Sequence, residues 1–414
     1  MFKNNSVSNT VDQIGLYSFY LAVFFLPLSM YLNNFFITVF ILVQCLGFLF
    51  FNFRSKIEIL KNSIKGLLII ALPFFMILIG DSYSEHISSA VKDTIRALPL
   101  LILPFSVLMI QKHNNSFLIE VSRYLIIGCV LASFICWINN IHVLYQSSLD
   151  WKILFSPQFA NIGLTKILDI HPSYLALTVN SSIALLVCFN TSLFKYKTLL
   201  YFFTFILILF LFNLLSRSAL AIFILGMLVF IILKKKWLLL GGLLTMLFGI
   251  FLLANNLKDN YLRDRLFKSL NFFEAQTTFS KKDSRFDRLN ASYQVFLIHP
   301  LIGTGTADED DLRKEFYKEN RDVTAYQNNY NSHNQFFEYL STYGLFGALV
   351  FILLITFVIV KSIQLKHCVY IFVFVSFFLS SMTESLLERT FGIVYFAIFA
   401  SLLIHSINFK VYET

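Results

Sequence analysis

The sequence predicts an all-α integral membrane protein with about twelve transmembrane helices and one large extracytoplasmic loop. Of its 414 residues, 57% are hydrophobic and only 14% are charged, which is more apolar surface than a soluble domain buries. Apolar runs of about 17 to 25 residues recur almost from end to end, and each is long enough to cross a hydrocarbon layer of roughly 30 Å as a helix. A single long hydrophilic stretch, residues 255–343, interrupts them.

The apolar runs also give the organisation of the chain. We expect nine spans within residues 1–254, a large periplasmic loop with short helices at 255–343, and three spans with a cytoplasmic C-terminus at 344–414. The first run has no small-residue cleavage site behind it, so we expect a retained span rather than a removed signal peptide. The expected spans are 14–32, 35–51, 65–80, 97–110, 121–139, 173–190, 197–214, 218–233, 237–254, 344–360, 367–383 and 391–407.

The distribution of basic residues predicts the orientation. With twelve spans and a cytoplasmic N-terminus, the short inside segments hold fifteen Lys and Arg residues and the short outside segments hold six. This bias follows the positive-inside rule and places both termini in the cytoplasm and the 255–343 loop outside. The loop holds 12 Lys and Arg against 13 Asp and Glu. Its near neutrality does not indicate nucleic acid binding.

Arg217 is the clearest positive charge held outside against the insertion bias. It stands between two apolar runs, in Asn213-Leu-Leu-Ser-Arg-Ser-Ala219. One interpretation is a snorkelling anchor at a helix end. The other is an anion site at the membrane surface, because a guanidinium offers a planar fork of donors to phosphate oxygens.

A capping box begins a helix in the large loop. Ser284 with Asp287 fits the [ST]-x-x-[DE] pattern, which makes Arg285 the first helical residue. At 100° per residue, Arg285 shares a face with Leu289, Tyr293 and Phe296, so we expect it along the apolar stripe. Beside free helix amides, Arg285 and Arg288 would suit a phosphate or pyrophosphate, with Arg288 contributing less because it lies about 60° off the stripe. The alternative is pairing with a loop carboxylate such as Asp283.

Two histidines are candidates on the same side. Ser332 and Gln335 form a second capping box, which predicts His333 in the first turn of a helix running into the tenth span. The positive helix end would keep its imidazole neutral and able to accept a proton, as a general base does, although a lone histidine is more often structural. His171 begins the sixth span, with Pro172 at an early helical position.

The remaining sequence patterns say little about function. No Walker A loop, GxGxxG unit, HExxH, CxxC pair or GxSxG elbow is present. The acidic run Asp308-Glu-Asp-Asp311 could hold a cation weakly, but we interpret it as a solvated turn. His299-Pro300, with Gly303 and Gly305, is typical of a turn that closes the loop helix.

These residues resemble the O-antigen ligase and Wzy-type polysaccharide polymerase superfamily. That family carries Arg-x-x-x-Leu in a large periplasmic loop, followed by His-[Asn/Ser/Gln], nine residues and Gly-x-x-[Gly/Thr/Tyr]. Arg285 and Leu289 match the first element, and His333, Asn334, Gly344 and Gly347 match the second. The resemblance extends to Arg217 and to the twelve-span plan, and it covers residues 200–390 best.

The resemblance implies a GT-C-like inverting glycosyltransferase that acts on the periplasmic face of the bacterial inner membrane. Its donor would be an undecaprenyl-diphosphate-linked glycan and its acceptor a hydroxyl of lipid A core, without nucleotide, cofactor or essential metal. Arg217 and Arg285 would stabilise the diphosphate, and His333 would act as the base. Arg288, Asn334 and His171 are candidates for substrate binding.

Two alternatives stay open at this point. A polymerase of the same superfamily would use a growing glycan as acceptor. A non-enzymatic flippase for lipid-linked oligosaccharides would more readily show paired repeats with broken helices and charges within the membrane, whereas the candidate residues here gather on one outer face.

Overall fold

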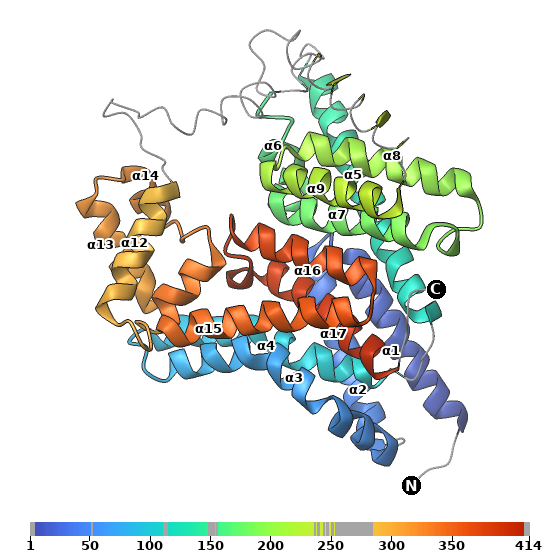
Figure 1. Cartoon of the computed structure of the whole chain (residues 1–414), viewed down its shortest axis with the longest axis horizontal. Helices are drawn as coiled ribbons and strands as arrows, with labels where there is room; N and C mark the ends of the chain where they lie inside the picture. Colours follow the sequence, from blue (N-terminus) through green and yellow to red (C-terminus); the bar gives the residue numbers. More distant parts are fainter. Residues whose placement is uncertain are drawn as a thin grey trace. The chain divides into compact units, whose positions relative to one another are not determined.

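The computed structural model describes residues 5–50, 53–110, 115–147, 156–235 and 285–409, with a few isolated positions between 154 and 252. Within these ranges every regular element is a helix and none is a strand (Figure 1). Internal contacts divide the chain into two compact units. The first comprises residues 1–23, 31–121 and 278–414, and the second comprises residues 24–30 and 122–277.

The all-helical prediction is confirmed, and each expected span other than 237–254 overlaps a helix, although 14–32 runs from α1 through a turn into α2. The early helices are α1 (Asn5–Phe25), α2 (Met30–Phe50), α3 (Phe53–Asp81), α4 (Ile87–Leu108) and α5 (Asn115–Gln146). The later ones are α7 (Pro172–Phe189), α8 (Lys197–Leu214), α9 (Arg217–Lys234), α15 (Gln335–Gln364), α16 (Cys368–Ser381) and α17 (Thr390–Asn408). Most of 237–254 lies outside the described residues.

Among the described residues, seven helices are long and apolar enough to cross a membrane, and α9 and α16 carry shorter apolar stretches. The exposed side chains of these helices are largely hydrophobic: Leu345, Phe346, Leu349, Ile352 and Leu353 lie exposed along α15. In water such an apolar stripe would promote aggregation, whereas in lipid it is the expected outer surface. The chain is therefore a multi-pass membrane protein. The count of twelve spans and the GT-C-like arrangement stay predictions.

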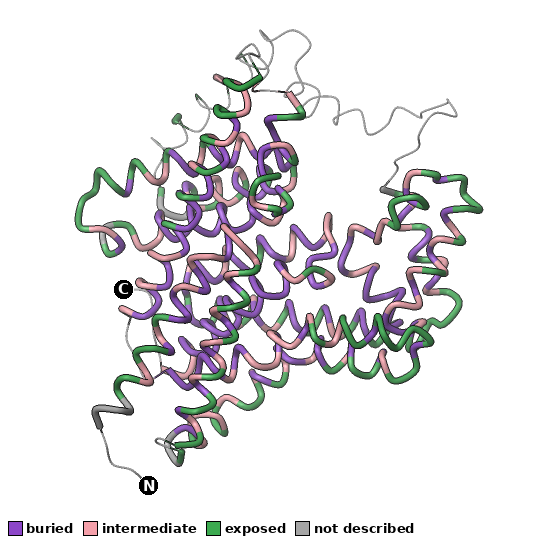
Figure 2. Tube along the Cα trace, turned by 180° about the vertical axis from the view of Figure 1, so that it is seen from behind, coloured by how far each residue is buried: buried purple, intermediate pink, exposed green. Residues whose placement is uncertain are grey.

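In the first unit, α17 is the central helix. It is buried over most of its length and packs against α3, α4, α15 and α16. The short loop helices α12 (Arg285–Ile298), α13 (Asp308–Glu319) and α14 (Val323–Asn328) gather at the N-terminal end of α15 (Figure 1). Figure 2 shows exposed residues (green) at high frequency in these three helices. Many side chains of these three helices therefore lie outside the packed core of the unit.

A break in α15 allows its backbone to form hydrogen bonds with the large loop. Gly344 has φ 64° and ψ −154° inside the helix, so the helical hydrogen bonds around it are lost. The turn at 299–305 replaces them: Gly305 N–H donates to the Thr342 carbonyl at 3.0 Å, and Leu345 N–H donates to the Pro300 carbonyl at 2.9 Å. The interpretation of His299–Gly305 as a turn is confirmed.

The second unit is built around α7, which is largely buried and packs against α8 and α9. α8 ends at Leu214, and Leu215, with φ 47°, turns the chain into α9. Two buried amides fix this turn, because Asn161 donates to the Leu214 carbonyl at 2.7 Å and Asn180 donates to the Ala219 carbonyl at 2.9 Å.

We predict that Gly344→Ala destabilises the protein by at least about 2 kcal/mol. A Cβ at this position would lie 2.5 Å from the Leu301 carbonyl carbon and oxygen and 2.6 Å from the Gly303 nitrogen, at a φ that side chains rarely adopt. The measurement is the thermal unfolding midpoint in detergent. Gly241→Ala is the matched control, because its added methyl would meet nothing within 4 Å. Equal midpoints for the two variants would contradict the proposed role of Gly344.

Candidate functional site

The carboxylate of Glu338 organises the loop end of the first unit. Its side chain is only 2% exposed and lies 2.7 Å from Nη2 of the equally buried Arg313. It also accepts hydrogen bonds from the Ser332 N–H at 2.8 Å, the Ser332 hydroxyl at 2.5 Å and the Ser385 hydroxyl at 3.2 Å. A buried carboxylate needs such complete pairing to offset its desolvation. One side chain thus joins α13, the 330–334 segment, α15 and the connection between α16 and α17.

The predicted capping box at Ser332 is wrong. The N-cap of α15 is Asn334, whose side-chain oxygen accepts from the Phe336 and Phe337 N–H groups at 3.0 and 3.2 Å. Ser332 does not cap because its hydroxyl is committed to Glu338. His333 consequently precedes the helix rather than occupying its first turn, and it adopts a left-handed conformation with φ 49°.

His333 is paired with a carboxylate that the sequence patterns did not single out. Nδ1 of His333 lies 3.1 Å from Oε2 of Glu384, and the side chains are 25% and 13% exposed. Because an ionised carboxylate only accepts hydrogen bonds, Nδ1 carries the proton in this pair and Nε2 holds the lone pair. The His333 N–H donates to Oδ1 of Asn331 at 3.1 Å, which further fixes the residue.

The α12 helix begins at Arg285 as predicted, but the predicted apolar stripe is wrong. The buried positions are Arg288, Ala291, Ser292 and Val295, whereas Tyr293 is 43% exposed. The buried face follows Arg288 because α12 packs against α13 and α15 on that side. Ser284 and the side chain of Arg285 lie outside the described residues.

Arg288 is therefore an internal cation, not one lying off the packed face. Its guanidinium stands over the Tyr330 ring at 4.4 Å, a favourable cation–π distance. Burial lowers the pKa of Arg288, whereas Tyr317, Tyr330, Asp322 and Glu384 oppose this shift. Tyr330 in turn meets the His333 ring edge-on, with centroids 5.7 Å apart. The structure thus brings Arg288, His333 and Asn334 together.

Arg217 and His171 belong to the second unit. Arg217 is exposed and is the first residue of α9, after the N-cap Ser216. His171 is the N-cap of α7, with its Nδ1 accepting from the Ser173 N–H at 3.4 Å. The early helical position of Pro172 is confirmed. The roles assigned to both residues stay predictions.

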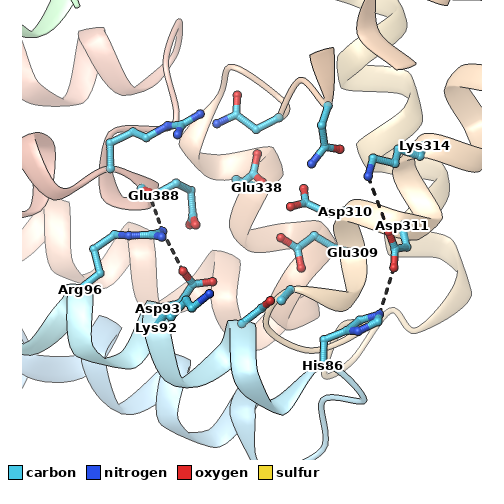
Figure 3. A pocket seen from close by; sticks show the side chains of 15 residues that line it. His86, Lys92, Asp93, Arg96, Glu309, Asp310, Asp311, Lys314, Glu338 and Glu388 are labelled. Atoms are coloured by element: carbon cyan, nitrogen blue, oxygen red, sulfur yellow. Dashed lines mark hydrogen bonds and ion pairs between the residues drawn. The ribbon is translucent and has the colours of Figure 1, made fainter. Parts of the chain in front are cut away.

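A charged cavity of about 420 Å³ adjoins the Glu338 network (Figure 3). Its walls come from the start of α4, the first turns of α13, the segment before α15 and the 388–389 connection. Arg96 bridges two of these walls: it lies 2.8 Å from the Asp93 carboxylate and donates to the Glu388 carbonyl at 3.0 Å. The basic lining residues are Lys92, Arg96, Lys314 and Arg389, and the acidic ones are Asp93, Glu309, Asp310, Asp311, Glu338 and Glu388.

The interpretation of Asp308–Asp311 as a solvated turn is wrong. The run is the first turn of α13, where acidic residues are stabilised by the helix dipole. Asp308 accepts from the Glu85 and His86 N–H groups, and Glu309 is buried with Arg313 3.8 Å away. Burial raises the pKa of Glu309 well above its usual range, and the neighbouring Asp310 adds to the shift. Among the described residues no group of His, Cys, Asp and Glu has the arrangement of a metal site.

Glu388 is a second acid of the cavity lining whose pKa is raised. Burial, the nearby Glu338 and Asp93 raise the pKa of Glu388 to about 8, and Arg96 opposes them. Glu388 is therefore largely protonated at neutral pH and can donate a hydrogen bond from its carboxyl group.

The sequence contained a signal for Glu384 and Glu388 that motif reasoning passed over. The chain has only 24 acidic residues, and these two lie in the short connection between the last two predicted spans. Acidic side chains beside membrane spans are uncommon without a functional or pairing role. Arg313 and Glu338 carried no comparable signal, because nothing in their spacing indicates that they meet.

We predict that the folded protein loses stability as pH rises from about 4.5 to about 8, and that Glu388→Gln reduces this loss. Between these values the folded state keeps the proton of Glu388 whereas the unfolded state releases it, so rising pH favours unfolding until the folded-state pKa of about 8 is passed. The measurement is the thermal midpoint against pH in detergent. Glu315→Gln, at an exposed position of α13, serves as the control. An unchanged pH profile in Glu388→Gln would contradict the raised pKa.

Comparison with known families supports the resemblance drawn from the motifs. Residues 202–352 match the family model described as O-Antigen ligase. The match begins in α8, continues through α9 and the loop helices, and ends in α15, so it includes Arg217, Arg285, His333 and Asn334. Curated proteins give no match. The predicted resemblance to the O-antigen ligase and Wzy-type polymerase superfamily is therefore confirmed over residues 202–352.

Proposed function

We propose that the protein is an inverting glycosyltransferase that moves a saccharide from an undecaprenyl-diphosphate carrier to an acceptor hydroxyl on the periplasmic face of the inner membrane. The proposed reaction is ligation of O-antigen to lipid A core. The observation that carries the proposal is the His333–Glu384 pair, at 3.1 Å, within a domain of the O-antigen ligase family.

The pair has the geometry of an oriented base. Glu384 holds the proton on Nδ1, so Nε2 is the nitrogen offered to an acceptor hydroxyl. A nearby carboxylate also stabilises the imidazolium that forms when the base takes up a proton. The half-buried position of His333 leaves its ring accessible while limiting its motion.

The proposed step is a displacement at the anomeric carbon of the donor sugar. Nε2 of His333 removes the proton from the acceptor hydroxyl, and the oxygen attacks the anomeric carbon of the donor sugar. A new glycosidic bond forms as the bond from the anomeric carbon to the diphosphate oxygen breaks, with inversion at that carbon. The leaving undecaprenyl diphosphate keeps the bonding electron pair, so its negative charge increases and needs fixed cations.

We assign Arg217 and Arg285 to that charge. Both stand at helix N-termini, where free amides add positive potential. Arg288, buried against Tyr330, supports the His333 segment rather than contacting the diphosphate freely. Asn334, also proposed for substrate binding, fixes the start of α15 as its N-cap.

A deletion strain separates ligation from polymerisation. Loss of a ligase leaves long glycan chains on the carrier lipid and bare lipid A core, whereas loss of a polymerase leaves single repeat units attached to lipid A core. We expect the first pattern, because the family description is that of a ligase. Unaltered surface polysaccharide and carrier-linked glycan would overturn both assignments.

We predict that His333→Gln lowers transfer by about 10² to 10⁴-fold, the usual contribution of a general base, while the protein still inserts and binds the lipid-linked donor. An amide hydrogen-bonds but does not accept the proton at neutral pH. Glu384→Gln should cost less, because it keeps a hydrogen-bonding partner but loses the charge. Initial rates with purified protein from pH 5 to 9 provide the measurement, and wild-type activity should fall on acidification as the ring is protonated. Substantial activity in His333→Gln would leave His333 as a positioning residue only.

We predict that Arg217→Ala and Arg285→Ala each weaken donor use, with Lys at either position restoring only part of it, because an ammonium keeps the charge but loses the guanidinium fork. The measurement is the transfer rate against donor concentration at matched protein levels. Arg321, exposed after α13, provides a control through Arg321→Ala. Normal transfer with both Arg217 and Arg285 replaced would exclude a role for these arginines in binding the diphosphate.

A further inference from the structure

The charged cavity has the size and lining of a binding site. Its volume of about 420 Å³ falls within the range of roughly 300 to 1,000 Å³ that small-molecule sites occupy. Figure 3 shows carboxylates, guanidinium groups and amides from separate elements pointing toward a common space. The walls are also rigid, because Arg96 ties α4 to the 388–389 connection and Arg313 ties α13 to α15.

One buried oxygen in this cavity is unsatisfied. The side chain of Glu309 is only 8% exposed, and its Oε2 has no hydrogen-bond partner within the part of the chain that the structure describes. Leaving such an atom unpaired costs about 1 to 3 kcal/mol. Because Glu309 lines the cavity, a polar group of a bound molecule can supply the missing hydrogen bond.

We propose that this cavity binds a hydroxyl-rich saccharide portion of a substrate, a proposal that rests on the glycosyltransferase function proposed above. Sugar hydroxyls both donate and accept, so they can pair with Glu309 and Asp310 and with the Asn329 and Asn331 amides. An apolar ligand would leave these groups unpaired. A phosphate would meet carboxylates as well as the four basic side chains on the same walls, so this mixed lining does not select an anion.

The protonation of the cavity suits a neutral ligand. Burial raises the pKa of Glu309 and Glu388, so both carboxyl groups can donate to a sugar oxygen without requiring a cationic partner. Ionised acids in the same positions would favour a cation instead.

The cavity also adjoins the proposed base. Asn331 lines it and accepts the His333 N–H at 3.1 Å, and Glu338 lines it while holding Ser332. Asn331, which lines the cavity, lies two residues before His333 in the chain. The cavity would thereby orient the saccharide whose hydroxyl or anomeric carbon reacts.

The proposal is tested by a substitution on α4 that fills the cavity. Ser89 lines it, whereas the adjacent Ser88 does not and is exposed. Ser89→Trp and Ser88→Trp therefore introduce the same bulk one residue apart on one helix, and Ser89→Ala keeps the space open. The full chain in nanodiscs is assayed with lipid-linked glycan and lipid A core, both extracted from the deletion strain, by varying each substrate in turn. Binding of the released free glycan is followed in parallel by saturation-transfer NMR.

We expect Ser89→Trp to raise KM for one substrate at least tenfold while Ser88→Trp behaves as wild type and Ser89→Ala, which keeps the space open, raises KM less than Ser89→Trp does. A rise for lipid A core assigns the cavity to the acceptor, and a rise for the lipid-linked glycan assigns it to the donor. Unchanged KM values for both substrates in a folded Ser89→Trp variant overturn the proposal. If wild-type protein shows no transfer, the proposed function fails; the saccharide cavity then stands only if free glycan binds wild type and not Ser89→Trp, and otherwise falls too.

Discussion

The buried ion pair of Glu338 and Arg313 is the interaction on which the loop end of the molecule depends. Removing either partner would leave an uncompensated charge in a place with little water, at a cost of about 3 to 5 kcal/mol. The same carboxylate fixes Ser332 and Ser385, which stand beside His333 and Glu384 in the sequence. Glu338 therefore fixes the distance between His333 and Glu384 through the residue next to each of them. The Glu338–Arg313 pair does not itself take part in the proposed reaction.

The backbone at the start of α15 and at Gly344 also fixes the position of the loop end relative to α15. Asn334 stops α15 from continuing backward through His333, so His333 can adopt its left-handed conformation and present its ring to Glu384. Ten residues further on, the break at Gly344 exposes backbone groups that form hydrogen bonds with the 299–305 turn. The cap and the break together bound a short helical segment that is held by the large loop at one end and by the connection between α16 and α17 at the other.

Much of the fold could be predicted from the sequence because a lipid environment leaves few options. Apolar length decides a span, and the predicted span at 197–214 coincides with α8. The first expected span, 14–32, ran past the end of α1 at Phe25, because the Pro27 turn stays within an apolar run. Helix faces in the loop were harder: Arg288 is buried through tertiary packing, and periodicity within a short helix of mixed polarity did not reveal it.

The site was predicted in its parts but not in its pairings. Spacing identified His333 and Arg285, because the family motif is local. Glu384 pairs with His333 across 51 residues, and Arg313 with Glu338 across 25, and no local pattern encodes such distances. The wrong prediction of Ser332 as the N-cap has the same cause. Serine is a favourable N-cap residue, but the Ser332 hydroxyl donates to the carboxylate of Glu338 instead.

The contacts of the last connection have a consequence for biogenesis. Gln335 accepts the Leu387 N–H at 2.6 Å, Asn334 donates to the Met382 carbonyl at 3.2 Å, and Glu384 holds His333. Each of these partners follows the loop in the chain and lies between α16 and α17. The loop end can therefore reach its native arrangement only after this connection has been made. Until then the nascent chain lacks the hydrogen bond that joins His333 to Glu384.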